Sequence, residues 1–168
     1  MLKKEVAKGS GGRVILMDSI TKVTPEDKGA IIVCALLRGD EKNFAVAEDV
    51  SKRMYAPVMR SHRATVDQMA ILEPVLSETV CATCLTIIRE ATDEAVRRGV
   101  AEEAARDFIL GHLNVELAIL FDQLPGVRMS DAANKAVERA KKEIFAPDWK
   151  KVFEREAIAE NIRMITSV

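Results

Sequence analysis

The longest helical pattern in the sequence is TVDQMAILEPVLSETVCATCLTIIREATDEAVRR, at residues 65–98. Apolar residues recur every three or four positions along this stretch, which predicts one amphipathic helix of 34 residues. Thr65 followed by Gln68 fits a capping box at its start, and Gly99 is expected to close its end. Such a helix is roughly 50 Å long. Pro74 should kink it or start it anew, because proline breaks the hydrogen-bond ladder.

Four further segments carry helical patterns, at residues 41–55, 101–123, 131–145 and 150–165. Asp40 and Ser130 are plausible N-caps for the first and third of them. In the first, the apolar face is expected at Phe44, Ala47, Val50 and Met54. The second is apolar nearly all the way round from Phe108 to Phe121, so we expect it to be buried. About five helices predict a mainly α fold.

The first 30 or so residues differ from this helical pattern. Residues 1–28 carry a glycine cluster and one short apolar run at 14–17, which predicts an N-terminal arm or linker with one strand. The apolar run AIIVCALL at 30–37 fits a buried strand or a short buried helix equally well. We therefore divide the chain into an arm at 1–28 and a helical domain at 29–168.

Composition excludes several function classes. The chain has 168 residues, a net charge of −1 and 4% aromatic residues, which argues against nucleic-acid binding. Its longest uninterrupted apolar run has eight residues, fewer than the roughly 20 of a membrane span. Three cysteines do not suggest a disulfide framework. We expect a cytoplasmic protein that binds neither nucleic acid nor membrane.

The stretch LEPVLSETVCA places polar groups on a helix otherwise built for packing. Glu73 and Ser77 are four residues apart and share a face, and Glu78 follows directly. Paired carboxylates beside a helix break are typical of a substrate or metal site. The alternative is a solvated helix face.

Two histidines are further candidates. His62 lies in the run Arg60-Ser61-His62-Arg63, where two arginines beside a histidine could bind a carboxylate or phosphate, or could simply be solvated. His112 lies in an apolar helix and must be hydrogen-bonded there or have a function. The CxxC pair Cys81 and Cys84 sits in mid-helix, where we expect small buried core residues rather than a redox or zinc site.

Several long runs resemble one known family in order along the chain. They are IVCALLRG, YAPVMRSHRATVDQMAILEPVLSETVCA, IREATDEAVRRGV, ARDFILGHLNVELAILF and DWKKVFEREAIAENIRMIT. The chain is similar over residues 29–168 to the C-terminal domain of phosphogluconate-dehydrogenase-like sugar-acid dehydrogenases, the D-apionate oxidoisomerase family. The resemblance implies a helical domain whose long central helix assembles a homodimer. It also implies a sugar-acid substrate and a role in carbohydrate metabolism.

The resemblance further implies a set of site residues. Glu73 would be the metal ligand, with a divalent metal such as zinc shared with a histidine of a preceding nucleotide-binding domain. Glu78 and His62 are the expected catalytic residues. The expected substrate-binding residues are Arg63, Ser77, Thr79 and His112.

The resemblance does not extend to the nucleotide-binding domain that precedes the C-terminal domain in this family. Residues 1–28 contain no HPxHP, no GxGxxG and no room for a Rossmann sheet. NAD is thus implied for the family, but we expect no NAD binding by this chain alone. Three explanations stay open: a fragment of a longer enzyme, a split gene with a separate NAD-binding chain, or a stand-alone remnant. The sequence predicts the substrate-binding and dimerisation domain of an NAD-dependent oxidoreductase, with a non-catalytic helical oligomerisation module as the alternative.

Overall fold

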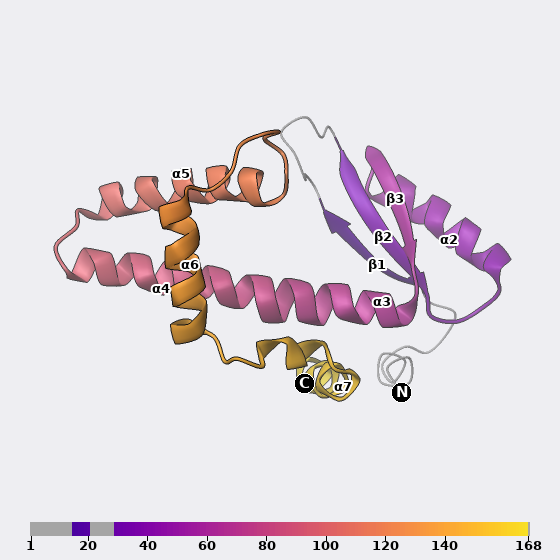
Figure 1. Cartoon of the computed structure of the whole chain (residues 1–168). Coiled ribbons are helices and arrows are strands. Elements are labelled where there is room, and N and C mark those ends of the chain that lie inside the picture. The colour runs from indigo at the N-terminus through magenta and orange to yellow at the C-terminus, as the bar shows by residue number, and fades with distance from the viewer. Residues whose placement is uncertain (1–14, 21–28, 168) are drawn as a thin grey trace. The chain divides into compact units, whose positions relative to one another are not determined.

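The computed structural model describes residues 15–20 and 29–167, which belong to two compact units (Figure 1). The first unit takes in residues 1–80 and 151–168, and the second takes in residues 81–150. The glycine cluster predicted as an arm, and the link predicted at 21–28, lie outside the described residues.

A three-stranded sheet forms one part of the first unit (Figure 1). Its order is β1 (Ile15–Ile20), β2 (Ala30–Leu36) and β3 (Val58–Ala64), with β1 antiparallel and β3 parallel to β2. The helix α2 (Glu41–Met54) connects the two parallel strands, as a parallel pair requires. The run at 30–37 is therefore a strand. Sequence analysis missed β3, because its residues VMRSHRA lack an apolar alternation.

The core of the sheet lies between β2 and α2. Ile32 and Cys34 of β2 are fully buried and pack with Phe44 of α2. β2 is buried on both faces, which explains why its sequence is a continuous apolar run.

The buried face of α2 differs from the predicted one. The structure buries Phe44, Glu48 and Ser51, whereas Val50 and Met54 are exposed. The prediction was wrong because it counted apolar residues only. Glu48 can be buried because β3 supplies hydrogen-bonding partners for its carboxylate.

Helical backbone is continuous from Val66 to Arg97, as the sequence predicts. It consists of α3 (Val66–Ile71), the π-helix η2 (Leu72–Ala82) and α4 (Thr83–Arg97). The capping box of Thr65 and Gln68 is confirmed, with the Gln68 N–H donating to Thr65 Oγ1 at 3.1 Å. At Pro74 the helix neither stops nor restarts but is widened into η2.

The helix α7 (Arg155–Thr166) packs on the start of this long helix. Ala70 and Val75 form a buried cluster with Ile158, Ala159 and Ile162. This cluster is the second core of the first unit.

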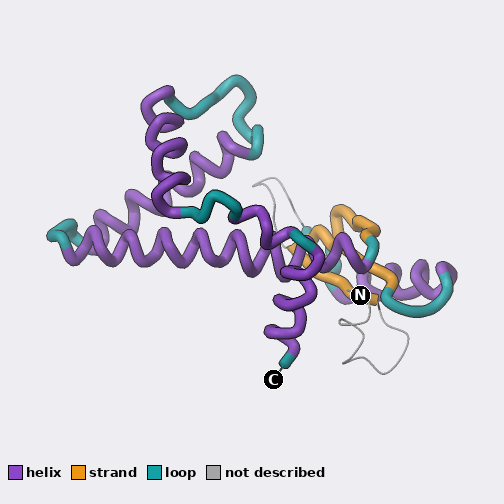
Figure 2. The backbone as a smooth tube through the Cα atoms, turned by 60° about the horizontal axis from the view of Figure 1, so that its bottom comes forward, coloured by secondary structure: helices purple, strands orange, loops and turns teal. Residues whose placement is uncertain are grey.

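The second unit contains α4, α5 (Glu102–Leu120) and α6 (Asp131–Ile144), followed by the 3₁₀-helix η3 (Trp149–Phe153) at its boundary. α4 and α5 lie side by side as an antiparallel pair (Figures 1 and 2). Gly99 makes the turn between them with φ of 102°, a value that favours glycine. The cap at Ser130 is confirmed by a hydrogen bond from the Ala133 N–H.

The helix α5 is not buried within the chain. Ala105 is its single buried residue among those described, and Phe108 and Phe121 are 67% and 70% exposed. The expectation of a centrally buried helix is therefore wrong for one chain by itself. Further large apolar side chains of this unit are exposed, namely Leu85, Leu110, Val115, Leu117, Leu120, Leu124, Val127 and Ile144.

The helix Val66–Arg97 is also long and apolar enough to cross a membrane by length and composition alone. That is weak evidence for a membrane span, because core helices of water-soluble proteins meet the same criterion. Glu73 and Glu78 lie in its apolar half, and carboxylates are costly in lipid.

Candidate functional site

The π-helix η2 carries the polar cluster that the sequence singles out. Glu73 is half-buried, and Ser77 and Glu78 are exposed. In a π-helix the backbone hydrogen bond joins residues five apart, so Glu73 lies one turn from Glu78 as well as near Ser77. π-Helical turns inside α-helices are frequent at functional sites. The structure thus places all three residues on one wide turn.

Thr79, a predicted substrate-binding residue, has its hydroxyl engaged within the protein. Thr79 Oγ1 donates to the Pro74 carbonyl at 2.6 Å. The same oxygen accepts from Asn161 Nδ2 of α7 at 2.7 Å. The hydroxyl proton is therefore committed to the helix itself.

His62 and Arg63 are on opposite faces of the sheet. Successive side chains of a strand alternate, and both belong to β3. Arg63 and Ser61 face α2, where they contact Glu48, so His62 faces the other side and is exposed. The structure does not bring His62 and Arg63 together as one binding group.

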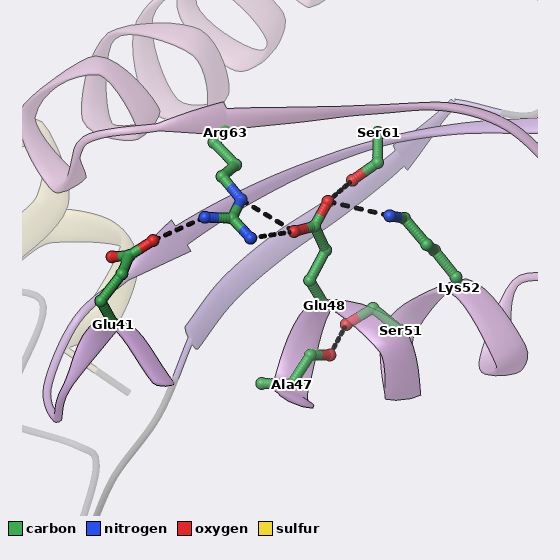
Figure 3. Close-up of polar contacts among 7 residues, drawn as sticks. All are labelled: Glu41, Ala47, Glu48, Ser51, Lys52, Ser61 and Arg63. Atoms are coloured by element: carbon green, nitrogen blue, oxygen red, sulfur yellow. Dashed lines mark hydrogen bonds and ion pairs between the residues drawn. The ribbon is translucent and has the colours of Figure 1, made fainter. Parts of the chain in front are cut away.

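Glu48 is the centre of a polar network between α2 and β3 (Figure 3). Its Oε1 accepts from the Ser61 hydroxyl at 2.6 Å and lies 3.1 Å from Lys52 Nζ. Its Oε2 accepts from Arg63 Nε at 2.8 Å and Nη2 at 2.6 Å. The other end of the guanidinium pairs with Glu41, and its plane lies over the Phe44 ring at 4.5 Å.

These contacts decide the charge states in the network. The Ser61 hydrogen bond, with those of Arg63 and Lys52, lowers the pKa of Glu48 from 4.5 to about 2, although burial opposes the shift. The hydrogen bond to Glu48 in turn raises the pKa of Arg63. The Cys34 thiol beside them has a raised pKa, first because of burial and then because of the Glu48 charge. Arg63 thus has two acidic partners inside the chain, and its predicted role toward a substrate stays a prediction.

His112 belongs to the second unit, on α5. Its Nδ1 lies 2.8 Å from the Phe108 carbonyl oxygen, and its ring stacks on the Phe108 ring at 4.0 Å. The residue is exposed, so the predicted hydrogen bond is present but the predicted burial is not.

The CxxC pair is not a buried core pair. Cys81 is exposed and Cys84 is half-buried, and both are free thiols. The expectation of small buried core residues is therefore wrong within one chain.

Each unit has a cavity of about 450 Å³. The one in the first unit lies where the parallel strands β2 and β3 end, the usual place for ligands in α/β units, and Arg155 of α7 contributes to its lining. The one in the second unit is a groove between α4 and α5 with the apolar lining Leu85, Ile88, Ile109, Leu110 and Leu113.

The described residues do not fit a dinucleotide. The turn after β2 has the single glycine Gly39, followed by Asp40 and by Glu41 in the first turn of α2. A pyrophosphate needs a glycine-rich turn and a helix start without opposing carboxylates. Nor do the described residues make a complete metal site, since no three His, Cys, Asp or Glu side chains among them could hold an ion. Glu73 would be a single ligand.

Two residues that matter in the structure were not found from the sequence. Glu48 lies at i+4 from Phe44, and Asn161 lies between Ile158 and Ile162 on the packing face of α7. A polar residue within an apolar face is the signal that could have revealed both.

Comparisons with known proteins agree with this architecture. Residues 27–166 match the family model "Phosphogluconate dehydrogenase (decarboxylating) C-term". A D-apionate oxidoisomerase from Cupriavidus necator is 58% identical over 135 residues, which are 80% of this chain and 49% of the relative. One from Blautia hydrogenotrophica is 38% identical over 128 residues, which are 76% of this chain and 45% of the relative. The chain thus spans about half the length of these relatives.

Two solved structures share the fold. A semialdehyde dehydrogenase NAD-binding protein from Cupriavidus necator, in complex with calcium and NAD, has a TM-score of 0.85 and 47% identity, covering 90% of this chain and 60% of that chain. An oxidoreductase from Jannaschia sp. CCS1, described as putative, has a TM-score of 0.83 and 31% identity, covering 98% and 65%. With a family match over residues 27–166, this chain belongs to the family of phosphogluconate dehydrogenase C-terminal domains.

Proposed function

We propose that this chain is the substrate-binding and dimerisation domain of a cytoplasmic NAD-dependent oxidoreductase that acts on a sugar acid of the D-apionate type. The observation that carries the proposal is the wide turn of η2, which presents Glu73, Ser77 and Glu78 together on one helix. Relatives that are 58% and 38% identical to the chain are D-apionate oxidoisomerases, and they support the substrate class.

The chain's own residues can bind and orient such a substrate. The exposed Ser77 hydroxyl can donate to and accept from sugar hydroxyls, since it has one proton and two lone pairs. The exposed Glu78 carboxylate can accept the proton of the hydroxyl that is oxidised. His62 is the second candidate for acid–base work, because one imidazole nitrogen can donate a proton while the other accepts one.

The NAD-binding groups and the further metal ligands would come from outside the described residues. NAD, when bound by a nucleotide-binding domain, supplies the hydride acceptor. A divalent metal such as zinc would need ligands in addition to Glu73. We therefore expect an NAD titration of the full chain to give no saturable signal, and tight binding would contradict the proposed division of labour.

The alternative is a non-catalytic oligomerisation module. The exposed apolar side chains of α5 favour assembly under both proposals, so self-association does not discriminate between them. Substrate turnover in a completed enzyme does.

The test is a chimera in which residues 27–166 replace the matching half of the Cupriavidus necator oxidoisomerase. We expect NADH formation from D-apionate, followed by absorbance at 340 nm. Glu73→Gln should reduce kcat/KM by at least about 100-fold, since a lost metal or substrate ligand in a positioned site has effects of that order, while the melting temperature stays nearly unchanged.

Glu138→Gln is the matched control, because it neutralises an exposed carboxylate on α6. It should leave the rate within about twofold of the parent chimera, since surface substitutions away from a site have small effects. An inactive parent chimera that is folded would favour the non-catalytic module. If Glu73→Gln unfolds the chimera, Glu73 is a structural partner in the core and the site assignment is wrong.

A further inference from the structure

Asn161 forms a closed ring of three hydrogen bonds with Pro74 and Thr79 of the π-helix. Its Nδ2 donates to the Pro74 carbonyl oxygen at 3.0 Å and to Thr79 Oγ1 at 2.7 Å. Thr79 Oγ1 donates to the same carbonyl at 2.6 Å. Pro74 and Thr79 are five residues apart, and Asn161 comes from α7, 87 residues further along the chain than Pro74.

The available donors and acceptors in this ring allow one arrangement of the hydrogen bonds. The Asn161 amide nitrogen donates toward both acceptors, and the Thr79 hydroxyl has one proton and accepts through a lone pair. The Pro74 oxygen accepts both remaining bonds. If the Asn161 amide were turned over, its oxygen would face the carbonyl oxygen of Pro74, which is repulsive.

The ring sits where the helix needs support. Pro74 has no N–H and its ring opposes the regular α-helical ladder, and the backbone around it is the π-helix η2. Ile158, Ala159 and Ile162 hold α7 against Ala70 and Val75, and this packing brings the Asn161 side chain to the wide turn. Asn161 thus joins the two ends of that turn through side-chain bonds.

The candidate residues lie inside or next to the turn that the ring closes. Ser77 and Glu78 lie between Pro74 and Thr79, and Glu73 directly precedes Pro74. A change in the backbone between Pro74 and Thr79 would move Ser77 and Glu78, which lie within it.

We propose that Asn161 is a positioning residue of the candidate site, which acts with Thr79 to hold the Pro74–Thr79 turn in the geometry that presents Glu73, Ser77 and Glu78. The inference rests on the proposed function of this turn. It assigns Thr79 to the support of the site rather than to direct contact with the substrate.

The first test uses the full chain and needs no activity. Asn161→Leu and Thr79→Val remove the hydrogen bonds at similar side-chain size. We expect amide hydrogen exchange of residues 77–82 to become at least about tenfold faster in both variants, as local opening grows easier. Thr79→Ser keeps the hydroxyl and should exchange within about threefold of the parent, since the ring is preserved. Asn134→Leu is the matched control, because Asn134 also donates its amide to a backbone carbonyl, that of Met129 in the second unit.

The second test uses the chimera described above. Asn161→Leu and Thr79→Val should lower kcat at least about tenfold with KM changed less, because misplaced reacting groups affect the chemical step most. Thr79→Ser, which keeps the hydroxyl, should have a kcat near that of the parent chimera. Asn134→Leu should also leave kcat unchanged. A role in stability alone would lower the melting temperature without this split between kcat and KM.

Each remaining outcome has a distinct meaning. Unchanged exchange in Asn161→Leu overturns the inference, whatever the enzyme does. Faster exchange with unchanged kcat shows that Asn161 stabilises the helix without positioning the site, which also overturns the inference. An inactive parent chimera overturns the proposed function and with it the inference, whereas an active parent with an unaffected Asn161→Leu variant overturns the inference alone.

Discussion

Single residues in the network around Glu48 show how a buried charge is tolerated in this protein. Glu48 is 8% exposed and accepts hydrogen bonds from Ser61 and Arg63, with Lys52 as a further cation. A carboxylate buried without partners would be strongly unfavourable, so β3 and α2 depend on each other through this group. Arg63 also stacks on Phe44, which adds a cation–π contact to the ion pairs.

Glu48→Gln is expected to lower the free energy of unfolding at pH 7 by up to about 3.5 kcal/mol, given about 1.4 kcal/mol per unit of pKa shift. The pKa of Glu48 is about 2 in the folded protein and 4.5 without its partners. The stabilisation is therefore present above pH 4.5 and is lost as the pH falls from 4.5 toward 2. Urea unfolding from pH 7 to pH 2.5 should show a weaker pH dependence in Glu48→Gln than in the parent.

Asp49→Asn is the control for this experiment. Asp49 is the next residue on α2 and pairs with Arg53, but its side chain is 58% exposed. We expect a loss of no more than about 0.5 kcal/mol, because exposed ion pairs contribute little. Equal losses in the two variants would show that the Glu48 network is not a special source of stability.

Among the elements, the long helix departs from its predicted form at one place. Its start, length and end follow from local signals, namely the capping box at Thr65, the apolar period and Gly99. Its conversion to a π-helix at Leu72–Ala82 does not follow from Pro74 alone, since a kink or a restart would also accommodate proline. α7 contributes a contact at this place, since Asn161 donates to the Pro74 carbonyl.

The cap of α3 gives a prediction at this scale. Thr65→Ala should lower the free energy of unfolding by about 1 kcal/mol, the usual cost of losing an N-cap side chain. Asp40→Ala is the control, since Asp40 is the N-cap of α2 but makes no side-chain cap hydrogen bond. It should cost no more than about 0.3 kcal/mol through the weaker helix-dipole interaction. Thermal unfolding of both variants checks the difference, and a larger loss in Asp40→Ala would contradict it.

In the whole molecule, the second unit leaves most of its apolar surface uncovered. Ala105 is the one buried residue of its described helices, although α5 is apolar on nearly every side. Monomeric proteins rarely expose contiguous apolar patches of this kind, so we propose that a second copy of the chain covers α5 and the groove beside α4.

Light scattering tests this assembly. We expect the parent chain to have about twice its mass of 18.5 kDa at micromolar concentration. Phe108→Asp should shift the protein to the monomer mass, because a carboxylate in an apolar interface is left without a partner. Lys135→Asp on α6 places the same group on an exposed polar position and should leave the dimer intact. A monomeric parent would contradict the proposal.

Features that depend on neighbours within about one helical turn could be predicted from the amino-acid sequence. The α-helical class, the helix at residues 65–98, the caps at Thr65 and Ser130 and the long family-like runs all belong here. These signals are local, since a capping box and an apolar period connect residues three or four apart.

Contacts between distant parts of the chain determine which polar groups are hydrogen-bonded and which apolar faces are exposed, and these contacts could not be predicted from local patterns. Glu48 meets Ser61 and Arg63 across 13 and 15 residues, and Asn161 meets Pro74 across 87. Whether α2 buries Val50 or Glu48 depends on the hydrogen-bonding groups that β3 places opposite it. The sequence of β3 has no apolar alternation from which a strand could be predicted. An apolar helix pattern predicts that a face is covered, but the partner lies elsewhere in the chain or, for α5, in the second copy that we propose.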